Sequence, residues 1–324
     1  MEWTADASAG DWLRGRIDDP WWGTMHDVVP RGFPAYARIF HPATRERPVG
    51  RSWPADGDPD GWEAFAAARP EVDTEWVRWA QAAAAFGTVM HPLAQWQRLL
   101  GRHDPHPDGT AARDGAGWRY LDPPEGQVEA ASLAAAAQIL SAHTTTPDAG
   151  FIALWEGWGG VTGGMGFGPS RTLVAVEPDA PPRHAEFLAH TGGDVFNNPL
   201  RKDTWQPGIL PDDVSRGPRL HLPGRDHVLF RGGVAELADP GWLRTAPWTD
   251  HAAEQFGGEP SAESPSLVWP DDRAWVLVSE VDFDSTVVGG SIPAIAALLA
   301  DPRLEAAAIG VDADLGWDAD EENR

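Results

Sequence analysis

From residue 148 onward the chain is divided into short apolar runs, each bounded by glycine or proline, and this pattern constrains the fold more than any other feature. Runs this short are typical of β-strands, because a helix needs a longer stretch to build an apolar face. The long stretches between the runs, 178–217 and 240–268, are predicted to be irregular. The pattern predicts strands over 151–156, 171–176, 219–222, 226–231 and 274–282.

The first half of the chain favours helices instead. Apolar residues at helical spacing predict a helix that starts at an N-cap on Asp73 and stops at Gly87, followed by a shorter helix over 92–100. An alanine-rich helix is expected over 125–142. A last helix is expected to follow an N-cap at Ser291.

Helices before strands predict an α+β fold, in which helices pack on one face of a mainly antiparallel sheet with long irregular loops. The first 60 residues show no helical or strand period and are expected to form loops. The chain divides into a helix-rich, tryptophan-containing part (1–147), a sheet-rich part (148–311) and an acidic tail (312–324), and the first two parts are either one domain or two. The tail holds six acidic residues and one arginine, which predicts a solvated segment.

Composition excludes several kinds of chemistry. The chain has no cysteine, so disulfides, thiolate nucleophiles and iron–sulfur clusters are excluded. Lys202 is the single lysine and follows no glycine-rich loop, so neither a phosphate-binding loop nor Schiff-base chemistry is indicated. No cofactor is therefore expected.

The net charge of the chain limits the kinds of partner that it is expected to bind. The chain has 25 basic and 49 acidic residues, a formal net charge of −24, and a field of that sign repels nucleic acid and anionic lipid. No run approaches the ~20 apolar residues that span a bilayer. The N-terminus has neither a basic nor an apolar segment, so a cytoplasmic location is expected. A basic protein is the partner that the charge favours, and the alternative is that acidity only keeps the chain soluble.

The segment 269–291 offers the clearest candidate for chemistry. If it is a strand, Glu280, Asp282 and Asp284 alternate onto one face, with neighbours ~6.6 Å apart. Carboxylates at that spacing can converge on one hard cation, or hold one carboxyl group protonated as a general acid. The alternative is that this face emerges into water. Two glycines, Gly289 and Gly290, are expected to turn the chain before the last helix.

The same segment resembles one that recurs in a family of actinobacterial proteins of unknown function. The resemblance is carried by the patterns Trp269-Pro-x-Asp-Arg-x-Trp275 and Glu280-Val-Asp-x-Asp-Ser-Thr-x-Val-Gly-Gly-Ser291. Segments 151–159 and 224–232 look similar to two further parts of that family. The resemblance covers about a third of the chain and implies a bacterial cytoplasm, but it assigns no catalytic residues.

Eighteen tryptophans are the other marked feature. We predict Trp158, Trp269 and Arg273 as contacts for a ligand or partner, because tryptophan and arginine are typical of binding hot spots. Glu156, beside Trp158 at a strand end, is a candidate general acid. Five tryptophans lie at the apolar phase of their elements and are expected in the core: Trp76, Trp79, Trp96, Trp155 and Trp275.

Two functions remain open from the sequence. The first is binding of a basic partner protein, in an immunity-like or scaffold role. The second is metal-assisted hydrolysis or another small-molecule reaction, with Glu280, Asp282 and Asp284 as ligands and Glu156 or Glu280 as the acid or base. An aromatic pocket that binds a ligand without turnover is a third possibility. An enzyme needs its carboxylates to converge in a cleft, whereas a binding protein tolerates them spread over a surface.

Overall fold

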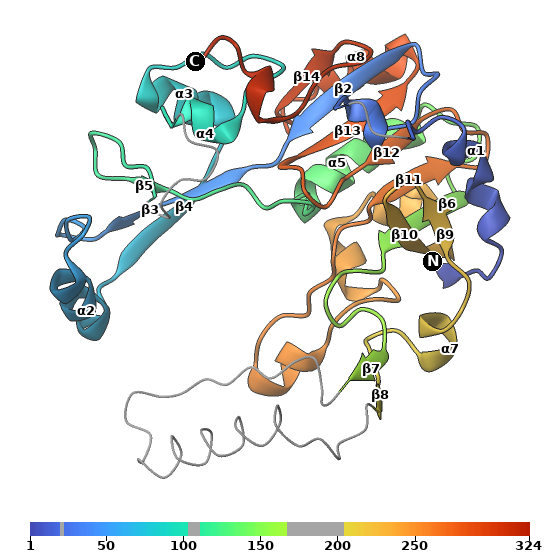
Figure 1. Ribbon diagram of the computed structural model, residues 1–324, viewed down its shortest axis with the longest axis horizontal. Helices are drawn as coiled ribbons and strands as arrows, with labels where there is room; N and C mark the ends of the chain where they lie inside the picture. The colour runs from blue at the N-terminus through green and yellow to red at the C-terminus, as the bar shows by residue number, and fades with distance from the viewer. Residues whose placement is uncertain (20–22, 103–110, 167–203) are drawn as a thin grey trace.

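The computed structural model describes residues 1–19, 23–102, 111–166 and 204–324. The chain forms an α+β fold around one large antiparallel sheet, which confirms the predicted class (Figure 1). A short strand, β9 (Leu220–Leu222), pairs with β10 beside the main path. The strand order is β1 (Glu2–Trp3), β10 (Arg225–Arg231), β6 (Gly150–Trp155), β11 (Leu267–Pro270), β12 (Val276–Val278), β13 (Ser285–Gly290), β2 (Ala35–Phe40) and β14 (Ala306–Ile309).

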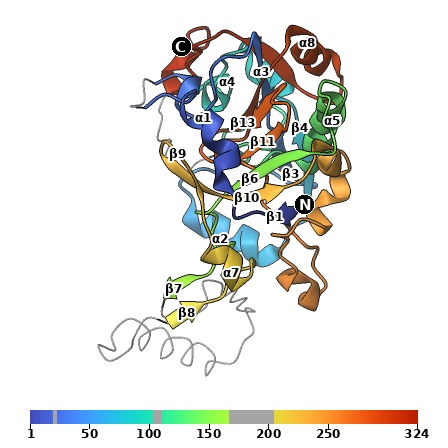
Figure 2. The same ribbon diagram turned by 90° about the vertical axis from the view of Figure 1, so that its right-hand side faces the viewer.

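Both faces of this sheet are covered. The longer helices, α5 (Ala130–Ser141) and α8 (Ile292–Ala300), lie on one face (Figure 2). The N-terminal segment, with α1 (Asp11–Arg14) and the 3₁₀ helices Ala7–Gly10 and Met25–Asp27, covers the other. Along β6, β10 and β12, successive apolar side chains alternate between the two cores. Because both faces are buried, the strands read as continuous apolar runs in the sequence.

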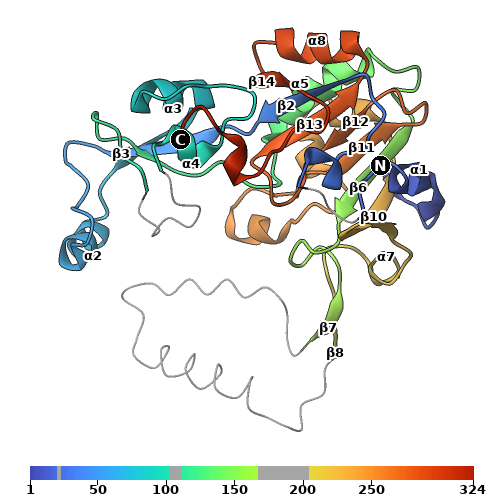
Figure 3. The same ribbon diagram turned by 45° about the horizontal axis from the view of Figure 1, so that its top comes forward.

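A second, three-stranded sheet extends from the body as an arm, with β3 (Ala43–Pro48) between β4 (Val72–Val77) and β5 (Arg119–Tyr120). Helix α2 (Pro59–Ala68) lies at its far end (Figure 1). At its base, α3 (Trp79–Phe86) and α4 (Trp96–Leu99) pack around a third apolar core, beside the C-terminus (Figure 3). The remaining described elements are the pair β7 (Gly164–Gly166) and β8 (Thr204–Gln206), helix α7 (Asp212–Ser215) and the 3₁₀ helices Val234–Leu237, Pro240–Arg244, Ala252–Phe256 and Trp317–Ala319.

The expectation of loops in the first 60 residues is wrong, because β2 and β3 lie there. The strand period of β2 is hidden because even its arginine, Arg38, is buried. The helix predicted from an N-cap at Asp73 is also wrong in its first half, since β4 pairs with β3 there. Trp76 on that strand is 62% exposed, not in the core. The predicted stop at Gly87 is confirmed, with a φ of 74° at the end of α3.

Two further helices are shorter than predicted. Only Trp96–Leu99 of 92–100 is helical, because residues 92 and 93 form a turn, and buried Arg38 donates hydrogen bonds to the carbonyl oxygens of Pro92 (3.4 Å) and Ala94 (2.8 Å) there. The alanine-rich helix begins at Ala130, after the Glu129 side chain accepts from the Ser132 N–H at 2.8 Å.

The strand predictions hold for 151–156, 219–222 and 226–231, whereas 171–176 lies outside the described residues. The predicted strand 274–282 ends at Val278, and a turn follows. The glycines Gly289 and Gly290 continue β13 rather than turn the chain. A Cβ at Gly289 would lie 2.8 Å from the rings of Phe33 and Tyr36, so close packing explains this glycine.

The predicted tryptophan core is confirmed at Trp79, Trp96 and Trp275, while Trp155 is half-buried. The N-cap of the last helix is confirmed at Ser291, whose Oγ accepts from the Ala294 N–H at 3.3 Å.

The main sheet takes strands from both sides of residue 147, since β1 and β2 pair with strands of the second half. The C-terminal residues do not form a solvated tail, because Asp320 and Asn323 are buried. Charge alone does not predict exposure, because a carboxylate surrounded by hydrogen-bond donors can be buried.

Candidate functional site: an acidic trench

The three carboxylates singled out in the sequence lie in the turn between β12 and β13, not along one strand face. Arg225 on β10 donates from Nε to Glu280 at 2.9 Å and also forms an ion pair with Asp282. Asp284 accepts from Arg38 at 3.1 Å. The turn thus brings the carboxylates into one region but pairs them with two different arginines.

This arrangement does not make a metal site. Over the described ranges, no group of three or more histidine or acidic side chains is placed to hold a metal ion. A guanidinium already occupies the space between Glu280 and Asp282.

Two adjoining clefts open on either side of this turn. The first has a volume of about 430 Å³ and is lined by the acidic side chains of Asp122, Glu125, Asp282 and Asp284. Its remaining walls include the rings of Trp96, Phe283 and Trp317, with Arg38 beneath. Trp96 is 3% exposed, and its Nε1–H has no hydrogen-bond partner among the residues described.

The second cleft has a volume of about 350 Å³. It shares five lining residues with the first, which therefore form the boundary between the two: Asp282, Phe283, Leu315, Gly316 and Trp317. We call the two clefts together the acidic trench. Of the described residues, eight acidic ones line it: Asp27, Asp122, Glu125, Glu280, Asp282, Asp284, Asp314 and Asp318.

The surroundings disfavour the negative charge of three trench carboxylates, which are Glu125, Glu280 and Asp284. Burial raises the pKa of Glu125, and the neighbouring charges of Asp284, Asp282 and Asp122 raise it further. Burial also raises the pKa values of Glu280 and Asp284, and this effect exceeds the opposing effect of the arginines that pair with them. A raised carboxyl pKa means that the surroundings disfavour the negative charge. Arg38 and Arg225 therefore do not neutralise the trench completely, and a cation would stabilise the negative charge that remains.

Buried groups beneath the first cleft fix its two walls. His41 donates from Nδ1 to the Pro124 carbonyl oxygen at 2.8 Å and accepts at Nε2 from the Thr286 hydroxyl at 2.9 Å. Burial lowers the pKa of His41 to about 4, so the ring is neutral. Arg38 donates from Nε to Ser285 Oγ at 2.8 Å. These contacts connect the wall that carries Glu125 to β13. This strand follows the turn with Glu280, Asp282 and Asp284, which we call the acidic turn.

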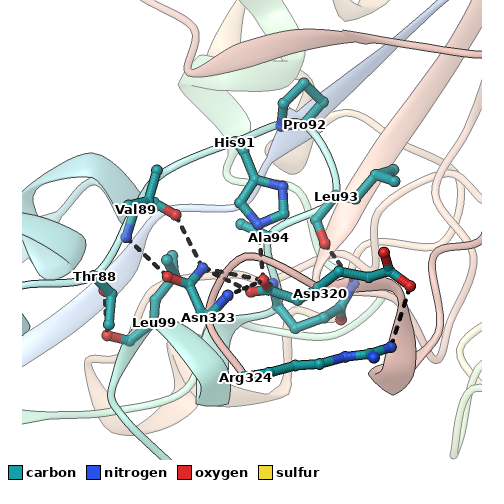
Figure 4. A network of polar contacts seen from close by, with 12 residues as sticks. Thr88, Val89, His91, Pro92, Leu93, Ala94, Leu99, Asp320, Asn323 and Arg324 are labelled. Carbon is teal, nitrogen blue, oxygen red and sulfur yellow. Dashed lines mark hydrogen bonds and ion pairs between the residues drawn. The ribbon is translucent and has the colours of Figure 1, made fainter.

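The C-terminal segment supplies the opposite wall and is held by two buried polar residues (Figure 4). The Asp320 carboxylate accepts from His91 Nε2 at 2.8 Å and from the Gln95 N–H at 3.0 Å. Asn323 accepts from the Val89 N–H at 2.9 Å and donates to the Val89 carbonyl oxygen at 3.0 Å. Burial opposes the charge of Asp320, but the hydrogen bonds from Asn323, Gln95 and His91 outweigh it and hold its pKa below the usual value.

The other residues predicted from the sequence lie outside the trench. Glu156 accepts from Arg219 Nε at 2.7 Å, beside a shallow cleft next to β10. Trp158 is half-buried against Trp155. Glu156 and Trp158 therefore do not form a common site with Glu280.

Trp269 and Arg273 also lie away from the trench. Trp269 is 1% exposed and stacks on Phe151, so its predicted contact with a ligand is wrong. The frequency of tryptophan in binding hot spots does not distinguish Trp269 from a core residue, and its side chain packs in the core under the N-terminal segment. Arg273 is exposed, has a φ of 54° and lies over the Trp12 ring at 5.3 Å.

Sequence reasoning missed the trench residues that come from other segments: Asp27, Asp122, Glu125, Asp314 and Asp318. The only signal was the acidic C-terminus, whose charge predicts a solvated segment.

In the part of the chain that is described, no helix is long and apolar enough to cross a membrane. Comparisons with protein-family models, with curated proteins and with solved structures find no significant match.

Proposed function

We propose that this protein acts by binding a basic partner protein in its acidic trench, in an immunity-like or scaffold role. The observation that carries the proposal is the cleft wall at Glu125, where four carboxylates face a hollow and burial and mutual repulsion raise the pKa of Glu125. Arginine or lysine side chains of a partner would relieve that repulsion. The net charge of −24 would also attract a basic partner over distance.

The aromatic walls of the trench support the same partner. Trp317 already takes the guanidinium of Arg98 over its ring at 4.7 Å. Aromatic faces bind cations through their quadrupole, and arginine is the residue that most often uses this contact. Carboxylates and rings on the same walls thus match a guanidinium or ammonium group in both charge and shape.

A short polyarginine peptide is the probe that tests the proposal, with binding measured by calorimetry over a range of salt concentrations. The variant Asp122→Asn/Glu125→Gln should bind about tenfold more weakly and with a smaller salt dependence, because two trench charges are lost. The matched control is Asp60→Asn/Glu63→Gln on α2, which removes the same charge from exposed sites on the arm. Equal binding by the two variants would reject the trench as the binding site.

The alternative prediction, metal-assisted hydrolysis, requires a cation to displace Arg225 from Glu280 and Asp282, and thermal melts with EDTA and then Mg²⁺ or Mn²⁺ test it. A cation that binds the native state should raise its melting temperature. A shift in the native chain that Asp282→Asn/Asp284→Asn lacks would favour the alternative over the basic partner.

A further inference from the structure

The boundary between the two clefts includes the start of the C-terminal strap, which we define as residues 316–324. Gly316 and Trp317 of the strap, together with Asp282 and Phe283 of the acidic turn, line both clefts. A movement of the strap would therefore change the boundary between the two clefts.

The strap is held by polar contacts rather than by apolar packing. Leu315 is the last buried apolar residue of the chain, and the two buried residues after it, Asp320 and Asn323, are polar. Asn323 bonds both backbone groups of Val89 and also donates from Nδ2 to Asp320 at 2.9 Å (Figure 4). A segment held by a few hydrogen bonds, with little buried apolar surface, opens at a lower free energy than the core.

The closed position of the strap also brings like charges together. Asp318 of the strap lines the second cleft with Asp27, Glu280 and Asp282. Arg98 offsets part of this repulsion, at 3.7 Å from the Asp318 carboxylate. Closure thus depends on the buried contacts of Asp320 and Asn323.

We propose that the partner enters as an extended basic segment that displaces the strap and lies across both clefts. This inference rests on the function proposed above and adds the form of the partner. An extended chain presents alternate side chains on one side, so basic residues two apart can enter adjoining clefts. Its backbone carbonyl groups could accept a hydrogen bond from the Nε1–H of Trp96, which has no partner among the described residues.

Hydrogen exchange tests whether the buried contacts of Asn323 hold the strap in place. Asn323→Ala removes both bonds to Val89, and amide exchange over 316–324 should become about tenfold faster. The control is Arg324→Ala on the same strap, because Arg324 is exposed and, among the residues that the structure describes, bonds within the strap to Asp318 and Glu321. Unchanged exchange in Asn323→Ala would overturn the inference that the contacts of Asn323 hold the strap in place.

Binding then tests the form of the partner, with a short polyarginine peptide and N-acetyl-arginine amide as probes. The peptide should speed exchange over 316–324 in the native chain and bind about tenfold more tightly to Asn323→Ala, whereas the single arginine should bind both chains alike. A peptide that binds while the strap stays protected overturns this inference alone. If neither probe binds either chain, the proposed function fails as well.

Discussion

The guanidinium of Arg38 on β2 lies 3.1 Å from the carboxylate of Asp284, in the turn before β13. Arg38 is 1% exposed, and its guanidinium also lies over the rings of Phe40 (4.7 Å) and Trp79 (5.3 Å). One buried arginine therefore connects the sheet, the α3 core and the acidic trench.

Arg38→Met should lower the free energy of unfolding by about 3 kcal/mol, because it leaves Asp284 without its cation. Urea unfolding of the variant measures the loss. Arg38→Met/Asp284→Asn should recover part of it, since the unpaired charge is then absent. A single variant as stable as the native chain would show that the pair contributes nothing to the fold.

Buried histidines should make the protein sensitive to mild acid. Burial lowers the pKa values of His41 and His227 to about 4, from the ordinary histidine value of 6.5. The unfolded chain then binds more protons than the folded chain, so the stability that is present above the unfolded pKa is lost as pH falls toward the folded value. Each histidine should cost about 2 kcal/mol between about pH 7 and pH 5.

Proton NMR of the imidazole resonances measures these pKa values directly, with His41→Gln and His227→Gln to assign the signals. The pH dependence of urea unfolding should be shallower in each variant than in the native chain. A midpoint near the ordinary histidine value would contradict the buried, neutral state.

Glu125→Gln should separate stability from binding. The raised pKa of Glu125 means that its charge destabilises the folded state at neutral pH, so the amide should leave the melting temperature unchanged or higher. Binding of a polyarginine peptide should weaken in the same variant. Scanning calorimetry and peptide titration check the two outcomes, and a destabilised variant would mean that the carboxylate has a structural role.

Gly126→Ala should disturb the wall that carries Glu125. Gly126 has a φ of 65°, and a Cβ there would lie 2.6 Å from the Val281 Cα in the acidic turn. Strain and the clash together should cost about 2 kcal/mol, measured by urea unfolding. Gly50→Ala is the control, since Gly50 has a φ of 67° but open space around its Cα. Equal losses in both variants would mean that only the backbone conformation matters.

Much of the fold could be predicted from local patterns, and the exceptions have physical causes. The strands around β6 and β10 were recognised because apolar runs bounded by glycine describe a strand buried on both faces. The helix placed over Asp73 failed because Trp76 and Val77 fit a helical period equally well, and only the pairing with β3 decides between the two structures. Tertiary contacts of this kind leave no local signal in one sequence.

The site was predictable only in part. Glu280, Asp282 and Asp284, which the sequence singles out, line the trench, but their partners, Arg225 and Arg38, lie far away in the sequence. The wall with Glu125 is also brought to the turn by the fold, since the Gly126 N–H bonds the Phe283 carbonyl oxygen at 2.7 Å.

Strand β2 pairs with β13 on one side and with β14 on the other, and its Arg38 bonds a serine 247 residues further along the chain. During synthesis on the ribosome, this strand therefore waits with both edges open until β13 and β14 have emerged. Contacts across so long a separation fold slowly, and open strand edges promote aggregation. We expect completion of the sheet to be the late, slow step in the maturation of this protein, and chaperone demand to concentrate on the nascent N-terminal half.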